Sequence, residues 1–197
     1  MQTFCNRLAP VLVLALAACA GEASDSLTAP VISLNQGNGV DLHVQGAGAI
    51  DFTAAGGGLG DFQFVAHRKA DGSVSGHFRQ RRFRPDGVVD FRGDVTCVTI
   101  DPAFPGRARI GGVVTENNST SPAFLTANHE VGDDVWFRVT DADHGLDPAD
   151  ASTSYGFKPT LVNTSAEYCS LPFTGLPAWN PGSIFPLEPG TINVTVH

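Results

Sequence analysis

The chain has 197 residues, a formal net charge of −8 and a mean hydropathy of +0.01. This length is enough for one domain with its own hydrophobic core. The acidic balance argues against nucleic acid as a partner, because a phosphate backbone repels a negatively charged surface.

The N-terminus carries the pattern of an export signal. A short region with Arg7 precedes an apolar run from Leu8 to Gly21, which is shorter than the roughly 20 residues of a membrane-spanning helix. The tetrapeptide Leu16-Ala17-Ala18-Cys19 lies at the end of this run. It resembles the lipobox of bacterial lipoproteins, a family in which the signal is cut before the cysteine and the sulfur carries a diacylglycerol.

This resemblance implies that residues 1–18 are a signal peptide and that Cys19 is lipidated and holds the protein on a lipid bilayer. Ala20 follows the cysteine and, by analogy with lipoprotein sorting, favours the outer membrane or the cell surface. The alternative is an ordinary cleavage site beside a chance cysteine. Residues 19–38 are small and polar, which predicts a flexible tether between lipid and domain.

Short alternating segments follow from residue 39 onward, separated by glycine, aspartate and proline. They predict one all-β domain over residues 39–197, and no window keeps a helical period over three turns. We expect a β-sandwich of antiparallel hairpins, with a small β-barrel as the alternative. The expected strands are 40–45, 49–53, 61–69, 73–83, 88–100, 107–115, 134–140 and 192–196.

One hairpin can be argued in detail. The segments 61–69 and 73–80 are joined by Ala70-Asp71-Gly72, and a three-residue loop with glycine in the left-handed position gives a type I turn with a bulge. This register places Phe64 opposite Phe78 on the core face. His77 and Arg79 then lie on the outward face.

The same region is basic in an acidic chain, with seven basic and three acidic residues from 68 to 92. In the predicted register His77, Arg79 and Arg81 share the outward face, and Arg92 joins them from the next strand. These four residues are a candidate binding site for an anionic ligand, such as a polyanionic envelope polymer or lipid headgroups. The alternative is a charged strand face that discourages edge pairing.

Cys97 and Cys169 remain once Cys5 is removed with the signal peptide and Cys19 is lipidated. An exported chain meets an oxidising compartment, so these cysteines are expected to form one disulfide, worth about 4 kcal/mol in the chain-entropy model. An even-length turn after Arg84 would keep Cys97 on the core face with Phe91, as an intersheet bridge. Two buried free thiols and a metal pair are the alternatives, although no CxxC or HxxxH spacing accompanies either cysteine.

The segment between Thr153 and Gly190 contains Pro172, Pro177, Pro181, Pro186 and Pro189, which argue against long central strands. We expect it to wrap the sandwich irregularly, held by Cys169. Phe173, Trp179 and Phe185 within it are expected to cover the core.

Asp141, Asp143 and Asp147 stand at alternate positions around a glycine. Ca²⁺ needs several oxygens converging from one tight loop, so this spacing marks a candidate calcium site. An EF-hand would need a glutamate where Ser152 stands, and flanking helices are not predicted. The alternative is a solvated turn at a strand end.

The predicted β domain also contains four short sequence motifs in a characteristic order, KADGSVSGHF, FRGDVTCVTI, ARIGGVV and VWFRVTDADHG. Together they resemble an uncharacterised all-β domain found in secreted bacterial proteins. The resemblance implies a compact extracytoplasmic β domain and brings no catalytic residue.

Catalytic motifs find little support in the sequence. Gly72-Ser73-Val74-Ser75-Gly76 has serines on either side of the GxSxG centre, and His129-Glu130 lacks the second histidine of a zincin. We therefore expect a non-enzymatic lipoprotein without a cofactor, which binds an envelope or extracellular ligand or is purely structural. An envelope polysaccharide hydrolase with paired carboxylates is the alternative.

Overall fold

Alternation of apolar and polar side chains produces the strands. Along β2 (Leu59–Arg68) the buried residues are every second one, and β1 (Leu42–Asp51) and β3 (Val74–Arg84) share this period of two over most of their length. The other strands are β4 (Gly87–Ile100), β5 (Arg107–Asn117), β6 (Asp134–Thr140), β7 (Ala151–Thr153), β8 (Gly156–Phe157) and β9 (Ile184–Val196). The helices are α1 (Ser165–Ser170) and the 3-10 turns η2 (Pro122–Phe124) and η3 (Ala142–His144).

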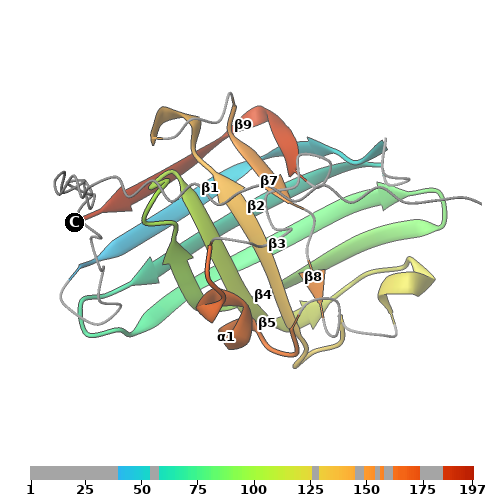
Figure 1. Cartoon of the computed structure of the whole chain (residues 1–197). Helices are drawn as coiled ribbons and strands as arrows, with labels where there is room; N and C mark the ends of the chain where they lie inside the picture. The colour runs from blue at the N-terminus through green and yellow to red at the C-terminus, as the bar shows by residue number, and fades with distance from the viewer. Residues whose placement is uncertain are drawn as a thin grey trace, which may run out of the picture. The chain divides into compact units, whose positions relative to one another are not determined.

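The computed structural model, shown in Figure 1, describes residues 40–53, 58–125, 129–144, 149–153, 156–157, 162–173 and 184–197. The predicted signal peptide, Cys19 and the tether therefore lie outside the described residues. All the described residues belong to one compact unit. Within them, every helix is too short or too polar to cross a membrane.

The strands form a single antiparallel sheet in the order β5-β4-β3-β2-β1-β9-β7-β6-β8. β5 also pairs with β6, so the sheet closes on itself and β8 adds to the outer edge of β6. Figure 1 shows β1, β2 and β3 side by side, with β5 and α1 in front of them. The predicted all-β class is confirmed. The sheet closes as a barrel does, and its two sides face each other across the core as the two layers of a sandwich do.

Phenylalanines fill the space between the two sides. Phe137 of β6 contacts Phe62 and Phe64 of β2 and Phe78 of β3, with ring centroids 5.2 to 6.3 Å apart. The Phe78 ring lies directly on Gly93, where a β-carbon would collide with it and with the Val113 carbonyl. This glycine is therefore required by close approach rather than by a turn.

The hairpin prediction is confirmed. Phe64 pairs with Phe78 and Ala66 with Gly76, and the three-residue loop ends at Gly72 with a φ of 84°. Arg84 pairs with Gly87, so the next turn has an even length, as expected.

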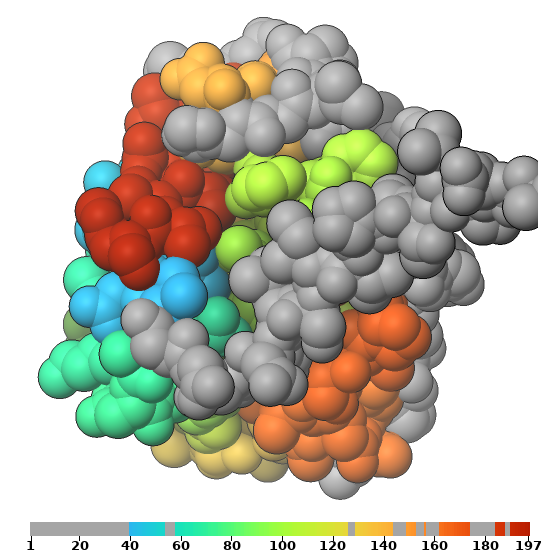
Figure 2. Space-filling model, turned by 60° about the vertical axis from the view of Figure 1, so that its left-hand side comes forward, coloured from blue at the N-terminus to red at the C-terminus, as the bar shows by residue number. Residues whose placement is uncertain are grey.

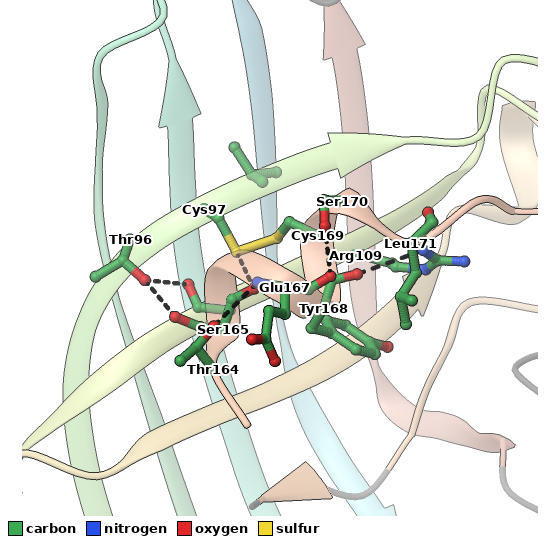
Figure 3. Close-up of a disulfide and its surroundings, with 12 residues drawn as sticks. Thr96, Cys97, Arg109, Thr164, Ser165, Glu167, Tyr168, Cys169, Ser170 and Leu171 are labelled. Atoms are coloured by element: carbon green, nitrogen blue, oxygen red, sulfur yellow. Dashed lines mark hydrogen bonds between the residues drawn. A yellow bond between two sulfur atoms is a disulfide. The ribbon is translucent and has the colours of Figure 1, made fainter. Parts of the chain in front are cut away.

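The predicted orientation of Cys97 is wrong. Val95 and Val98 both belong to the core, and the register between β4 and β5 shifts between Val95 and Cys97. This β-bulge adds Thr96 to the strand and turns Cys97 to the outer side of the sheet. Cys97 faces α1 there instead of the opposite side of the barrel (Figure 3).

The predicted irregular segment around Cys169 is wrong in part, because residues 165–170 form the helix α1. Thr164 caps this helix by accepting a hydrogen bond from the Glu167 N–H, and six residues are too few to show helical periodicity in the sequence.

β9 is also longer than expected. Its first part, with Pro186, pairs with β7, and its second part, from Leu187, pairs with β1.

The predicted aromatic cover is borne out at Phe185, which packs on the core and meets the edge of Phe52 at 4.8 Å between centroids. Phe173 instead lies against the guanidinium of Arg109. The distance from the guanidinium carbon Cζ to the centroid of the Phe173 ring is 4.1 Å. Trp179 lies outside the described residues.

Candidate functional site

The outward side chains of neighbouring strands β9, β1, β2, β3 and β4, with one residue of β5, form a continuous surface that we call the polar face. Four of the six histidines of the chain lie on it, from β1, β2, β3 and the residue after β9. The face consists of His43, Gln45, Asp61, Gln63, His67, His77, Arg79, Arg81, Asp90, Arg92, Asp94, Glu116, Asn193 and His197.

Four shallow hollows follow one another across the polar face. The largest, of about 510 Å³, is lined by His43, His67 and His197, and we call it the histidine hollow. The second, of about 250 Å³, lies next to it and reaches Gln63, which it shares with the third. The third shares Arg79 with the fourth. The row crosses from β9 to β5, which is roughly 24 Å at the usual strand spacing.

The predicted anion-binding residues lie together on this face. Arg79 and Arg92 are cross-strand partners, and Arg81 and His77 flank Arg79 on β3. His77 lines the second hollow, whereas Arg79 and Arg81 line the third. The placement deduced from the register is therefore confirmed, and anion binding itself stays a prediction.

Two of these arginines hold carboxylates of the same face. Arg79 donates two hydrogen bonds to Asp90, at 3.1 and 2.9 Å, which raise the pKa of the guanidinium further above its ordinary range. Arg92 forms an ion pair with Glu116. Arg81 lies 5.0 Å from the centroid of the exposed Phe83 ring and forms no ion pair with a described residue. Of the three, Arg81 is thus the most available to a ligand.

The net charge of the polar face depends on its histidines. At neutral pH its three arginines and four carboxylates nearly cancel. Because histidine changes charge near pH 6.5, acidification adds positive charge to a face that is otherwise close to neutral.

The histidine hollow was missed by the sequence analysis. His43 and His67 are paired in the β1–β2 register, with ring centroids 4.0 Å apart. Burial lowers the pKa of His43 below its ordinary value of 6.5, and the neighbouring His67 and His197 lower it further. The register of the β1–β2 pair would have revealed this contact, but β1 was predicted as two separate strands.

The predicted calcium ligands have other partners. Both carboxylate oxygens of buried Asp141 accept backbone N–H groups, from Asp143 at 3.0 Å and from Val194 at 2.8 Å. Asp143 is exposed, and Asp147 lies outside the described residues. The described part of the chain holds no group of three or more potential metal ligands, so nothing adds to the sequence argument for calcium.

The disulfide is present, and it attaches α1 to the outer surface of β4 and β5. Cys97 and Cys169 are bonded, with their Cα atoms 6.2 Å apart. The fully buried Arg109 donates to the carbonyls of Leu171 at 2.5 Å and Pro172 at 3.0 Å, beyond the end of the helix (Figure 3). Burial raises the pKa of Tyr168 to about 12, so this phenol stays neutral.

Paired carboxylates do occur in two hollows, but their contacts do not fit glycoside hydrolysis, which needs one protonated acid. In the fourth hollow Asp90 and Glu116 are each bound to an arginine. In the histidine hollow Asp41 accepts the N–H of Ala70, and hydrogen bonds from Ser73 lower the pKa of Asp71.

Figure 2 shows the end of the polar face, where the start of β1, the end of β9 and the β2–β3 loop lie next to one another on the surface. Comparisons of the chain with protein-family models, curated proteins and solved structures returned no match.

Proposed function

We propose that the protein is an exported lipoprotein, anchored through Cys19, whose β domain binds an anionic polymer of the cell envelope or its surroundings without catalysing a reaction. The observation that carries the binding role is the row of four hollows on the polar face, lined by arginine, histidine and amide side chains. The lipobox Leu16-Ala17-Ala18-Cys19 carries the anchor.

An extended ligand suits this surface because the hollows adjoin over about five strand spacings and none is a deep enclosed cavity. The amides of Gln45, Gln63 and Asn193 offer both donors and acceptors to a chain of hydroxyl-bearing units. Arg81 offers a charged donor at the third hollow. Arg79 is held in position by Asp90, and its remaining N–H groups can donate to a sulfate, phosphate or carboxylate.

Dextran sulfate and uncharged dextran test the proposal, because they share a backbone and differ in charge. We expect the full-length protein to bind dextran sulfate in a salt-sensitive manner and to bind dextran much more weakly. Arg81→Gln should weaken binding to dextran sulfate by roughly five- to tenfold, the effect of one charged contact. Titration calorimetry measures both affinities.

Arg84→Gln is the matched control. It removes the same charge from the same strand, but Arg84 pairs with Asp86 and lines none of the four hollows. An equal loss in both variants would mean that dextran sulfate responds only to total charge. Absence of any binding, or equal binding of the two polymers, would contradict the proposal.

A further inference from the structure

We infer that the histidine hollow is a proton-operated anion site, which binds the sulfate, phosphate or carboxylate groups of the ligand in mild acid and releases them above neutral pH. The inference rests on the proposed function, since it assigns the regulation of binding on the same polar face.

Two close imidazole rings are the centre of this site. His43 and His67 project outward from neighbouring strands, and their ring centroids lie 4.0 Å apart. His197 lines the same hollow from the end of β9. At such a distance two protonated rings repel each other, so the second proton is hard to add unless a negative charge lies nearby.

Further positive charge surrounds the rings. Arg68 and Lys69 line the hollow, and neither forms an ion pair with a residue in the described ranges. The two side-chain carboxylates of the hollow are turned to the backbone of the β2–β3 loop. Asp41 accepts the N–H of Ala70 at 2.7 Å, and Asp71 accepts the N–H of Ser73 at 2.8 Å. They limit the positive charge without closing the hollow.

The other neighbours of the rings carry little charge. Next to His43 on β9 stands Thr195, and next to His67 on β3 stands Ser75. One step further along the face, His77 on β3 is paired with Asp94 on β4. Protonation of His43, His67 and His197 therefore changes the charge of this end of the polar face more than any other group does.

Anion binding and proton binding then strengthen each other. An anion in the hollow beside the two rings offsets their repulsion and favours the protonated state, and by linkage the protonated state holds the anion more tightly. Each proton taken up with the ligand changes the affinity by up to about tenfold per pH unit. A transition metal would show the opposite dependence, because it binds neutral imidazole and is displaced by protons.

The test uses dextran sulfate, whose sulfate groups stay ionised throughout, and the full-length protein without a tag after His197. We expect wild-type affinity to be at least tenfold higher at pH 5.5 than at pH 7.5. In the double variant His43→Gln/His67→Gln this ratio should fall below about threefold, with unchanged circular dichroism. His77→Gln, on the same face but outside the histidine hollow, should keep most of the ratio.

The outcomes separate the two proposals. Equal wild-type affinities at both pH values, or an unchanged ratio in the double variant, overturn the proton-operated site but leave binding to the polar face in place. Failure to bind at either pH contradicts the proposed function and the inference together. Binding of Zn²⁺ at pH 7.5 that the double variant abolishes, combined with pH-independent dextran sulfate binding, overturns the inference in favour of a metal site.

Discussion

Single side chains set the charge of the polar face. Arg79 pairs with Asp90 and Arg92 pairs with Glu116. These four residues hold one another in position and add no net charge to the face. Exposed ion pairs of this kind stabilise a fold by at most about 1 kcal/mol, which leaves them free to exchange partners with a ligand. His43, His67 and His197, which form no ion pair with a described residue, are the residues whose ionisation changes what the face attracts.

His43 also affects folding. Its pKa is lowered in the folded protein, whereas the unfolded chain takes up the proton near the ordinary value of 6.5. The unfolded state therefore binds more protons as the pH falls through 6.5, and the free energy of unfolding decreases until the folded pKa has been passed. His43→Gln should reduce this acid-induced loss of stability between about pH 7.5 and 5.

Urea denaturation at several pH values measures the effect. Gln45→Ala, at the next outward position of β1, is a control that contains no titrating group and should lose stability in acid as the wild type does. If His43→Gln and the wild type lose the same stability between these pH values, the pKa of His43 is not lowered in the folded protein.

At the scale of elements, α1 is held by a small set of strong contacts. The Ser165 N–H and hydroxyl both donate to Asp134 of β6, at 2.7 and 2.5 Å. Tyr168 stacks on Trp136 at 5.6 Å between centroids, and Arg109 binds the carbonyls after the helix. The disulfide adds a covalent link to a segment that no strand pairing holds over residues 162–173.

Reduction of the disulfide should loosen this segment first. We expect amide exchange to increase over residues 165–173, while the hairpins between 61 and 115 keep most of their protection. Cys97→Ser/Cys169→Ser should lower the free energy of unfolding by about 4 kcal/mol or less, as the chain-entropy model gives for such a loop. Peptide-level hydrogen exchange with and without reductant is the measurement. Unchanged exchange in 165–173 would show that Arg109 and the packing of Tyr168 suffice.

The same elements show how far the sequence predicts the fold. Strands β2 to β5 follow from alternation. The 70–72 loop sets the β2–β3 register, so Phe64 opposite Phe78 and the shared face of Arg79 and Arg81 were predictable, and the even-length turn after Arg84 brings Arg92 beside them. The Gly46-Ala47-Gly48 stretch of β1 lacks large apolar residues and divided that strand in two, which hid the contact of His43 with His67.

Other features had no local signal. The bulge that turns Cys97 outward adds one residue, Thr96, to β4. The sequence around Thr96 is equally typical of a strand with a bulge and of a strand without one. The close approach of the Phe78 ring to Gly93 depends on the packing of the finished core. β7 and β8, with three residues and two, are too short to show a period.

At the scale of the whole molecule, the last strand joins the sheet through side chains as well as through strand pairing. Asp150 accepts the Ile192 N–H at 2.7 Å and Asp141 the Val194 N–H at 2.8 Å, on the edge of β9 that faces away from β1. These two carboxylates satisfy backbone groups that the short β7 does not reach. The candidate calcium ligand Asp141 therefore has a structural role at the closure.

The proposed anchor gives a prediction for the full chain in its cell. Cys19→Ser should release the protein from the membrane fraction or block cleavage of its signal, because the proposed attachment is the lipid on this sulfur. Fractionation and mass spectrometry of the purified protein distinguish these cases. A Cys19→Ser protein that is cleaved and still sediments with membranes as the wild type does would show that Cys19 is not the attachment site.

Hydroxyl-radical footprinting with bound dextran sulfate tests the central claim most directly, because it reports where the ligand covers side chains. The polar face account predicts that His43, His67 and His77 become protected at pH 5.5, while exposed Leu125 and Val131, outside the four hollows, keep their reactivity. Protection of Leu125 and Val131, with the three histidines unchanged, would place the ligand elsewhere and contradict the account.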